Sequence, residues 1–407
     1  MTLTEKALAT LLQESGSRLS PEDVDTLIAG IAAAPAAVDA DRWMMLVADR
    51  RTPELEGVLR ALLAAERQRL DSAAAARPLV GDRVASLRAE LAHRDLDGFV
   101  VPLADEHQSE FPPGRARRLE LLTGFTGSAG IAVILADKAA LFVDGRYTLQ
   151  ARNQVDDALF EQQNIGRTAP HGWIAENAKK GTRIAYDPWL HTEDGLHALQ
   201  AGAVRAGAEM VPAEPNPIDV VWTDQPAAPI APVEAHPVEY AGRDSVEKRN
   251  DVAAALAREG ASALILSAPD SINWLLNIRG GETPNTPAAL GFAALRADGS
   301  VDLFMDPRKF TGPARTALGS DVTIQPPSAL GACLDALGQA GESVQISPGT
   351  TPSWIIQRLI DAGATLIRGK DPCVMPKACK NSVEIQGMRN AHIRDGAALC
   401  RFLAWLS

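Results

Sequence analysis

The histidines are the residues best suited to metal binding or proton transfer, but their spacing builds no recognised site. The chain has seven of them, and no two lie four residues apart: His93, His107, His171, His191, His197, His236 and His392. His191 and His197 flank Glu193 and Asp194, yet a separation of six residues places two side chains on different faces of a helix. We therefore expect no metal site among these residues.

The motifs that bind phosphate or activate a nucleophile are not found either. No serine lies in a GxSxG pattern, and no cysteine has a convincing histidine partner. The spacing of Cys373 and Cys379 is too long for a zinc knuckle. Gly124, Gly127 and Gly130 form GxxGxxG after a predicted helix, whereas the dinucleotide fingerprint follows a strand. These glycines favour a tight turn into the next strand.

One arginine is a candidate for ligand binding. The sequence DGRY runs from Asp144 to Tyr147 and follows a predicted strand, so Arg146 could offer its planar guanidinium to a carboxylate. The structural alternatives are an ion pair with Asp144 or stacking on Tyr147. Asp306 and Arg308 recur at the equivalent turn of a later repeat, which favours a structural role.

Composition sets the general class of the protein. The chain has 407 residues, 46% of them hydrophobic and 22% charged, which is typical of a globular protein with two or three domains. Its net charge of −11 argues against nucleic-acid and anionic-membrane partners. No apolar run reaches the roughly 18 residues that span a bilayer, and no secretory signal opens the chain. The four cysteines indicate isolated thiols in a reducing compartment, so we predict a soluble, cytoplasmic protein.

The elements of the chain fall into a helical part and an α/β part. Residues 1–75 are predicted to be helical, with a capping serine and a first-turn proline at Ser20-Pro21. Beyond Pro78, predicted helices alternate with short buried strands such as 98–102, which indicates an α/β fold. The proline-rich segment 212–237 is interpreted as a linker.

The α/β part contains an internal repeat. GIAVILADKAALFVDGRY, from Gly130, resembles GFAALRADGSVDLFMDPRKF, from Gly291. Each begins with glycine and an apolar strand, turns at Ala-Asp, and ends in a second strand followed by aspartate and arginine. We therefore predict two copies of one α/β fold on either side of the linker.

The last segment, 380–407, is predicted to be a helix with an apolar surface. Asn381 and Glu384 form a capping box, and apolar residues then recur on one face. From Ala397 onward the other face is apolar as well, which is typical of a buried helix. The helix either docks on the preceding domain or is the first helix of a domain whose remainder this chain does not contain.

Six blocks of sequence resemble a known family. In order they are HQSEF from His107, RRLELLTGFTGSAG from Arg117, DGRYTLQA from Asp144, DPWL from Asp187, INWLLNIRG from Ile272, and the helix from Lys380. Together they resemble the cytosolic, three-domain type of Xaa-Pro aminopeptidase. This resemblance implies an α/β fold class with two tandem creatinase-like N-terminal domains, followed by a pita-bread metallopeptidase domain.

The resemblance also implies a domain division and a chemistry. It divides the chain into a helical extension (1–78), a first creatinase-like domain (79–237), a second one (238–378) and the first helix of a truncated metallopeptidase domain (379–407). In complete members, two divalent metals, usually manganese, drive hydrolysis of the bond before a proline in the second position of a peptide. The family's metal ligands have no counterpart here, so we expect no metal in this chain and no activity from it alone.

The resemblance leaves several roles open. Arg146 and His107 lie in family-like blocks of the first domain, and both are weak candidates for holding the peptide. A homodimer is expected only where the catalytic domain is present. The alternatives to a non-catalytic portion are a split enzyme completed by a separate catalytic chain, and a module that binds peptides or proteins without catalysis.

Overall fold

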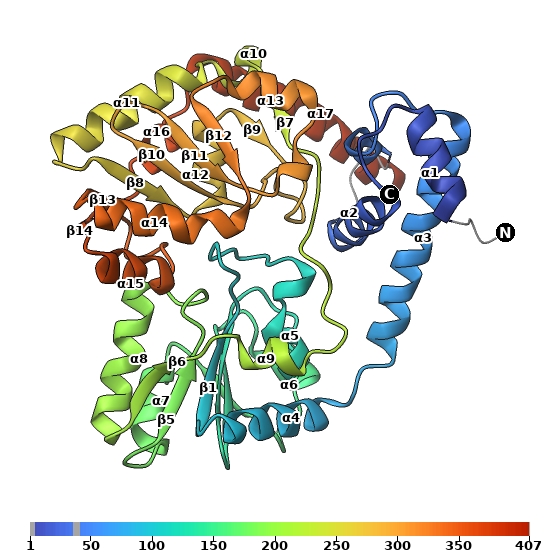
Figure 1. Ribbon diagram of the computed structural model, residues 1–407. Helices are drawn as coiled ribbons and strands as arrows, with labels where there is room; N and C mark the ends of the chain where they lie inside the picture. The colour runs from blue at the N-terminus through green and yellow to red at the C-terminus, as the bar shows by residue number, and fades with distance from the viewer. Residues whose placement is uncertain (1–4, 36–40, 407) are drawn as a thin grey trace.

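The helical region comes first in the structure, a computed structural model that describes residues 5–35 and 41–406. It lies beside the α/β part of the molecule (Figure 1). Its elements are α1 (Glu5–Glu14), α2 (Pro21–Ala33), the 3₁₀-helix η1 (Arg42–Leu46) and α3 (Pro53–Ala75). The predicted start of α2 is confirmed, because Ser20 and Asp23 form a reciprocal capping box. Leu27, Leu55 and Leu59 are among the residues of a separate small core.

The first α/β domain is a mixed six-stranded sheet covered by helices on both faces. Its strand order is β4-β3-β2-β1-β5-β6, and only β2 runs opposite to the other strands. The strands are β1 (Gly98–Pro102), β2 (Gly130–Leu135), β3 (Ala139–Val143), β4 (Glu161–Asn164), β5 (Arg183–Tyr186) and β6 (Glu209–Pro212). The helices are α4 (Val80–His93), η2 (Gly114–Ala116), α5 (Arg118–Thr123), α6 (Thr148–Gln154), α7 (Pro170–Asn177), α8 (Glu193–Ala206) and α9 (Pro217–Val221).

Strand β1 shows why this sequence forms a buried central strand. Successive side chains of a strand point to opposite faces of its sheet. Phe99 and Val101 accordingly pack with α4, α5 and α9 on one face, whereas Val100 packs with α7 and α8 on the other. Because both faces are covered, every position of the strand core must be apolar, which gives an unbroken apolar run instead of an alternating one.

The second α/β domain repeats the first, which confirms the predicted duplication. Its strand order is β12-β11-β10-β8-β13-β14, and only β10 runs opposite to the other strands. The strands are β8 (Ala263–Leu266), β10 (Phe292–Arg296), β11 (Val301–Phe304), β12 (Val322–Gln325), β13 (Ser343–Ile346) and β14 (Thr365–Arg368). The helices are α10 (Val238–Ala241), α11 (Ser245–Arg258), α12 (Pro269–Leu275), η3 (Pro307–Lys309), α13 (Gly312–Leu318), η4 (Pro327–Ala329), α14 (Leu330–Gln339), α15 (Ser353–Ala362), α16 (Val374–Ala378) and α17 (Ser382–Leu406).

The segment predicted as a linker is more ordered than its proline content indicates. It contains α9, whose Ile218 is buried in the first domain, and β7 (Glu234–Ala235), which pairs with β9 (Ile278–Arg279). Between them, Ile230 packs into the helical region against Gly30. The segment connects the two domains, but it is packed against them, because Ile218 and Ile230 are buried and β7 pairs with β9.

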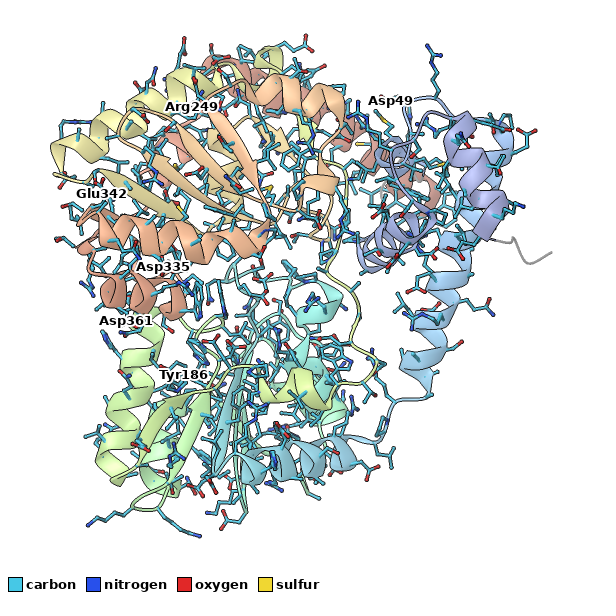
Figure 2. The ribbon with its side chains drawn as sticks, in the orientation of Figure 1. Asp49, Tyr186, Arg249, Asp335, Glu342 and Asp361 are labelled. Atoms are coloured by element: carbon cyan, nitrogen blue, oxygen red, sulfur yellow. The ribbon has the colours of Figure 1, made fainter. Side chains whose placement is uncertain are left out.

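Side chains of both α/β domains gather at the boundary between them (Figure 2). Strand β5 ends at Tyr186, and the chain beyond it carries Trp189, which stacks on Trp354 of α15 with ring centroids 4.2 Å apart. Nearby, the Trp354 N–H donates to the Pro188 carbonyl oxygen at 3.0 Å. Arg368 forms an ion pair with Glu193 across the same boundary, at 2.7 Å. These contacts fix the relative position of the two sheets.

Candidate functional site

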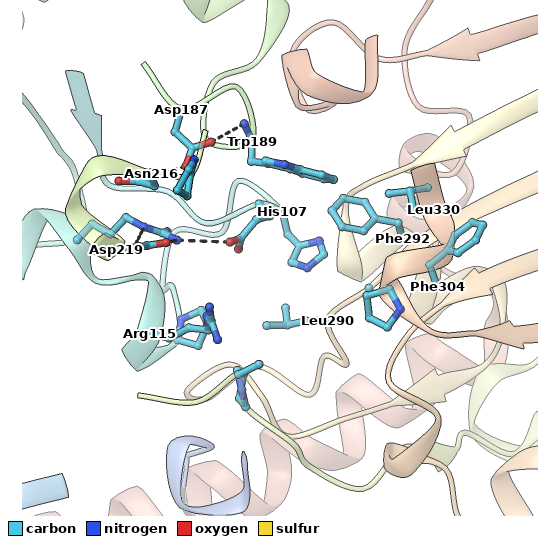
Figure 3. Close-up of a pocket in the computed structure, with 18 of the residues that line it drawn as sticks. His107, Arg115, Asp187, Trp189, Asn216, Asp219, Leu290, Phe292, Phe304 and Leu330 are labelled. Atoms are coloured by element: carbon cyan, nitrogen blue, oxygen red, sulfur yellow. Dashed lines mark hydrogen bonds and ion pairs between the residues drawn. The ribbon is translucent and has the colours of Figure 1, made fainter. Parts of the chain in front are cut away.

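A cleft lies between the two α/β domains and has a volume of about 560 Å³. Its walls differ in chemistry, as Figure 3 shows: charged groups gather on one side, and Phe292, Phe304 and Leu330 gather on the other. His107 and Leu290 project between them. A cavity of this size with an apolar wall and a few polar groups is typical of a small-molecule site.

The charged wall is built around Arg118, the first residue of α5. Its side chain is 3% exposed and donates to both carboxylate oxygens of Asp219, at 2.8 Å each. Glu106 lies 3.6 Å away from the same guanidinium. Arg118 Nη1 has no hydrogen-bond partner among the described residues. Arg118 therefore holds α5, α9 and the 106 loop together at the floor of the cleft.

Asp187 is the most strongly perturbed acid in the cleft. Its Oδ1 accepts from the Trp189 backbone N–H at 2.9 Å, and its Oδ2 accepts from Asn216 Nδ2 at 2.7 Å. Burial raises the pKa of the Asp187 carboxyl to about 6, although both hydrogen bonds favour the charged form. The residue thereby ties Trp189 to α9 and shapes one edge of the cleft.

The apolar wall comes from the second domain. Phe292, at the start of β10, lies 4.5 Å from the His107 ring centroid and 5.8 Å from the Trp189 ring centroid. The His107 Nδ1 atom lies 3.3 Å from the Ser267 carbonyl oxygen, so this ring bridges the two domains. Lys309 closes the wall and forms a buried ion pair with Glu282 at 2.8 Å.

The structure separates the two residues predicted to hold a ligand. His107 lines the cleft. Arg146 lies elsewhere, where its Nη2 donates to Asp144 at 2.7 Å and its guanidinium sits 5.2 Å from the Tyr147 ring centroid. Both structural alternatives for Arg146 are thus present at once, and Arg308 pairs with Asp306 at 2.6 Å in the equivalent turn. A role for either residue in substrate binding stays a prediction.

The residues present do not fit the two metals that the family resemblance implies. Across residues 5–35 and 41–406, no group of three or more His, Cys, Asp or Glu side chains is placed to hold a metal ion. His191 is buried, whereas His197 is exposed on α8 and Glu193 pairs with Arg368.

None of the described helices combines the length and the apolarity that a membrane span needs.

Helix α17 carries the second notable surface of the chain. Its predicted capping box is confirmed: Asn381 Oδ1 accepts from the Glu384 N–H at 3.0 Å, and Glu384 Oε2 accepts from the Asn381 N–H at 2.9 Å. Asn381 Nδ2 also donates to the Ala241 carbonyl oxygen at 2.9 Å, which anchors the helix to α10. No residue of α17 is buried, and Leu399 and Trp405 are 55% and 78% exposed.

This exposure contradicts docking of the apolar end of the last helix on the preceding domain. Its start contacts α10 through Asn381, whereas the apolar residues after Ala397 are exposed. Phe402 and Leu406 are more than half exposed, like Leu399 and Trp405. Large contiguous apolar surfaces of this kind mark interaction sites.

Sequence reasoning missed most of the cleft. Arg118, Asp187 and Trp189 stood out only as parts of family blocks. Their partners are remote, since Arg118 and Asp219 are 101 residues apart. Besides His107, the available signal was the internal repeat, because two similar α/β domains in tandem create a boundary where a cleft can form.

Comparisons with known proteins agree with this architecture. Residues 83–221 and 224–384 each match a family described as the creatinase/prolidase N-terminal domain. The chain is 36% identical over 336 residues to a probable Xaa-Pro aminopeptidase P of Aspergillus niger, covering 80% of this chain and 54% of that protein. For the protein of the same name from Talaromyces stipitatus, the identity is 36% over 334 residues, and the coverage is 80% and 51%.

A solved structure gives the same result. The X-prolyl aminopeptidase of Caenorhabditis elegans, described as a cytosolic enzyme with a di-nuclear active site, superposes with a TM-score of 0.76 at 28% identity. The match covers 81% of this chain and 56% of that one. The chain thus spans about half the length of the relatives it matches. These matches confirm the resemblance seen in the sequence blocks, and the chain belongs to the Xaa-Pro aminopeptidase family, whose creatinase-like N-terminal domains it carries in tandem.

Proposed function

We propose that the chain supplies the non-catalytic, creatinase-like portion of a cytoplasmic Xaa-Pro aminopeptidase. In this proposal, peptides with proline in the second position are cleaved by a metallopeptidase domain that holds two divalent metals, usually manganese. The metals supply the activated water for hydrolysis when bound. The present chain contributes the two α/β domains and the first helix of the catalytic domain, and it has no activity by itself.

The exposed apolar surface of α17 carries this proposal. Leu399, Phe402, Trp405 and Leu406 are large side chains that gain free energy when they are buried, about 1.5–3 kcal/mol for each of the aliphatic ones and the phenylalanine. A metallopeptidase domain packed on this surface would bury them. The anchoring of Asn381 on Ala241 sets the direction in which α17 leaves the second domain, and hence the position of that domain.

The test combines the chain with a catalytic part. We would fuse or co-express it with the half of the Aspergillus niger relative that it does not match, and assay manganese-dependent release of the residue before proline. We expect cleavage from the combination and none from this chain alone. Phe402→Glu should abolish the cleavage by placing a charge in the packed surface. Gln386→Glu is the control and should retain the cleavage, because Gln386 is exposed and lies on the opposite side of α17 from Phe402.

Two outcomes would refute the proposal. One is cleavage by this chain alone. The other is a folded, soluble combination whose activity does not respond to Phe402→Glu. Activity from two separate polypeptides, without fusion, would favour the split-enzyme form of the same proposal.

A further inference from the structure

The cleft between the α/β domains has two opposite charges whose hydrogen-bonding capacity is unused. Arg115, in η2, is half-buried, and no described residue gives its guanidinium an ion pair or a hydrogen bond. Glu106 is 34% exposed, and its one ion pair among the described residues is with Arg118, at 3.6 Å. Among the other charged side chains of the cleft, Arg118 pairs with Asp219 and Lys309 pairs with Glu282. Asp187 is held by hydrogen bonds from Trp189 and Asn216, and Glu214, which also lines the cleft, is exposed.

The apolar wall faces these two charges. Figure 3 places Arg115 on the same side of the cleft as Asp219, with Leu290 and Phe292 across the open space. Leu290 and Phe292 are each 7% exposed, so both still present some apolar surface to the cleft. The stack of Trp189 on Trp354 holds the two walls at a fixed separation, so the cleft is formed before a ligand arrives.

We propose that this cleft binds a short apolar peptide with both of its termini free. The terminal carboxylate pairs with Arg115, because a guanidinium matches the planar geometry of a carboxylate. The terminal ammonium pairs with Glu106, whose carboxylate has no closer cation than Arg118. The apolar side chains of the peptide pack on Leu290 and Phe292. This inference concerns a site without metal ligands and does not depend on the proposed peptidase function.

Charge balance favours a ligand of this kind over a simple anion or cation. Arg118 already lies between Asp219 and Glu106. An anion alone would therefore be repelled by these carboxylates and attracted mainly by Arg115. A cation alone would leave the Arg115 guanidinium without a partner. A zwitterion satisfies both groups at once, and leaving either of them unpaired in a half-buried site carries a free-energy cost.

The test is binding of leucyl-phenylalanine to the full chain, measured by calorimetry. We compare the free dipeptide with its N-acetyl form, its C-terminal amide and glycylglycine. Loss of one charge-assisted hydrogen bond of about 1.5–3 kcal/mol corresponds to a loss of affinity of about 10-fold or more. We therefore expect the free dipeptide to bind at least about tenfold more tightly than either blocked form, and glycylglycine to bind most weakly.

Two variants test which side chain binds which terminus of the dipeptide. Arg115→Gln should weaken the free dipeptide by about tenfold and leave the amide unchanged, because the amide has no carboxylate to lose. Glu106→Gln should weaken the free dipeptide and leave the N-acetyl form unchanged. Arg117→Gln is the matched control, since Arg117 is exposed, pairs with Glu120 and does not line the cleft.

The proposal is overturned by any of three results. The first is no binding of the free dipeptide at millimolar concentration. The second is equal or tighter binding of a blocked form. The third is binding that neither Arg115→Gln nor Glu106→Gln changes while circular dichroism shows both variants folded.

Discussion

The buried ion pair of Lys309 with Glu282 gives a sharp stability prediction for the second α/β domain. Lys309 Nζ donates to Glu282 Oε2 at 2.8 Å and to the Leu290 carbonyl oxygen at 3.0 Å. Glu282 Oε2 also accepts from the Leu290 N–H at 2.7 Å, and the Glu282 side chain is fully buried. Lys309→Met keeps the apolar stem of the side chain but leaves the carboxylate in the interior without a cation. Removing one partner of a buried pair costs about 3–5 kcal/mol.

The measurement is urea unfolding at neutral pH, followed by circular dichroism. The matched control is Lys179→Met, because Lys179 pairs with Asp137 at 3.2 Å with both side chains mostly exposed. An exposed pair of this kind contributes about 0–1 kcal/mol, so the control should unfold close to the wild type.

A double variant separates loss of contacts from loss of charge balance. Glu282→Gln in the Lys309→Met background keeps an acceptor for the Leu290 N–H and removes the charge, so it should restore stability relative to the single variant. Two results would contradict a stabilising role for the buried pair: a loss of stability in Lys309→Met no larger than that in Lys179→Met, or further destabilisation of the Lys309→Met protein by Glu282→Gln.

Two further predictions concern pH and the anchor of the last helix. Burial lowers the pKa of His191 from 6.5 to about 4, so between these values the unfolded chain binds a proton that the folded one does not. Acidification from pH 7 to 4 should therefore lower the free energy of unfolding of the wild type by up to about 3 kcal/mol more than that of His191→Asn. Urea unfolding measures this difference, with His197→Asn as the control. Parallel pH profiles for the wild type and His191→Asn would contradict the prediction. Gly242 has φ +70° and faces Asn381 closely, so Gly242→Ala should loosen the start of α17. Amide hydrogen exchange at residues 381–386 should be faster in Gly242→Ala than in the wild type. Gly396→Ala is the control, because nothing lies near the added methyl group there. Equal exchange in the two variants would contradict this prediction.

The regular elements could be predicted because their signals are local. The strand at 98–102 is an apolar run of the length of a buried strand, and the capping box of Asn381 and Glu384 lies within four residues. The duplication could also be predicted, since the paired turns at Asp144 and Asp306 preserve their order in both copies. Each of these patterns depends on neighbours in the sequence, and tertiary contacts only reinforce it.

The cleft could not be predicted in the same way. Its geometry depends on pairs such as Trp189 with Trp354 and Lys309 with Glu282, which no periodicity in the sequence connects. The sequence around Arg115 does not distinguish it from an arginine on the protein surface. Only the tertiary structure shows that the second domain lies opposite it. The linker shows the same limitation, because the proline content of 212–237 conceals the apolar residues that dock it.

The contact of Trp189 with Trp354 has a spectroscopic consequence. Two indole rings with centroids 4.2 Å apart and an interplanar angle of 20° are close enough for their electronic transitions to couple. The near-ultraviolet dichroism of such a pair depends on the mutual orientation of the rings. Because one ring belongs to each α/β domain, any hinge motion that opened the cleft would alter this signal. The near-ultraviolet dichroism of this tryptophan pair would therefore report a change in the angle between the two α/β domains without an added label.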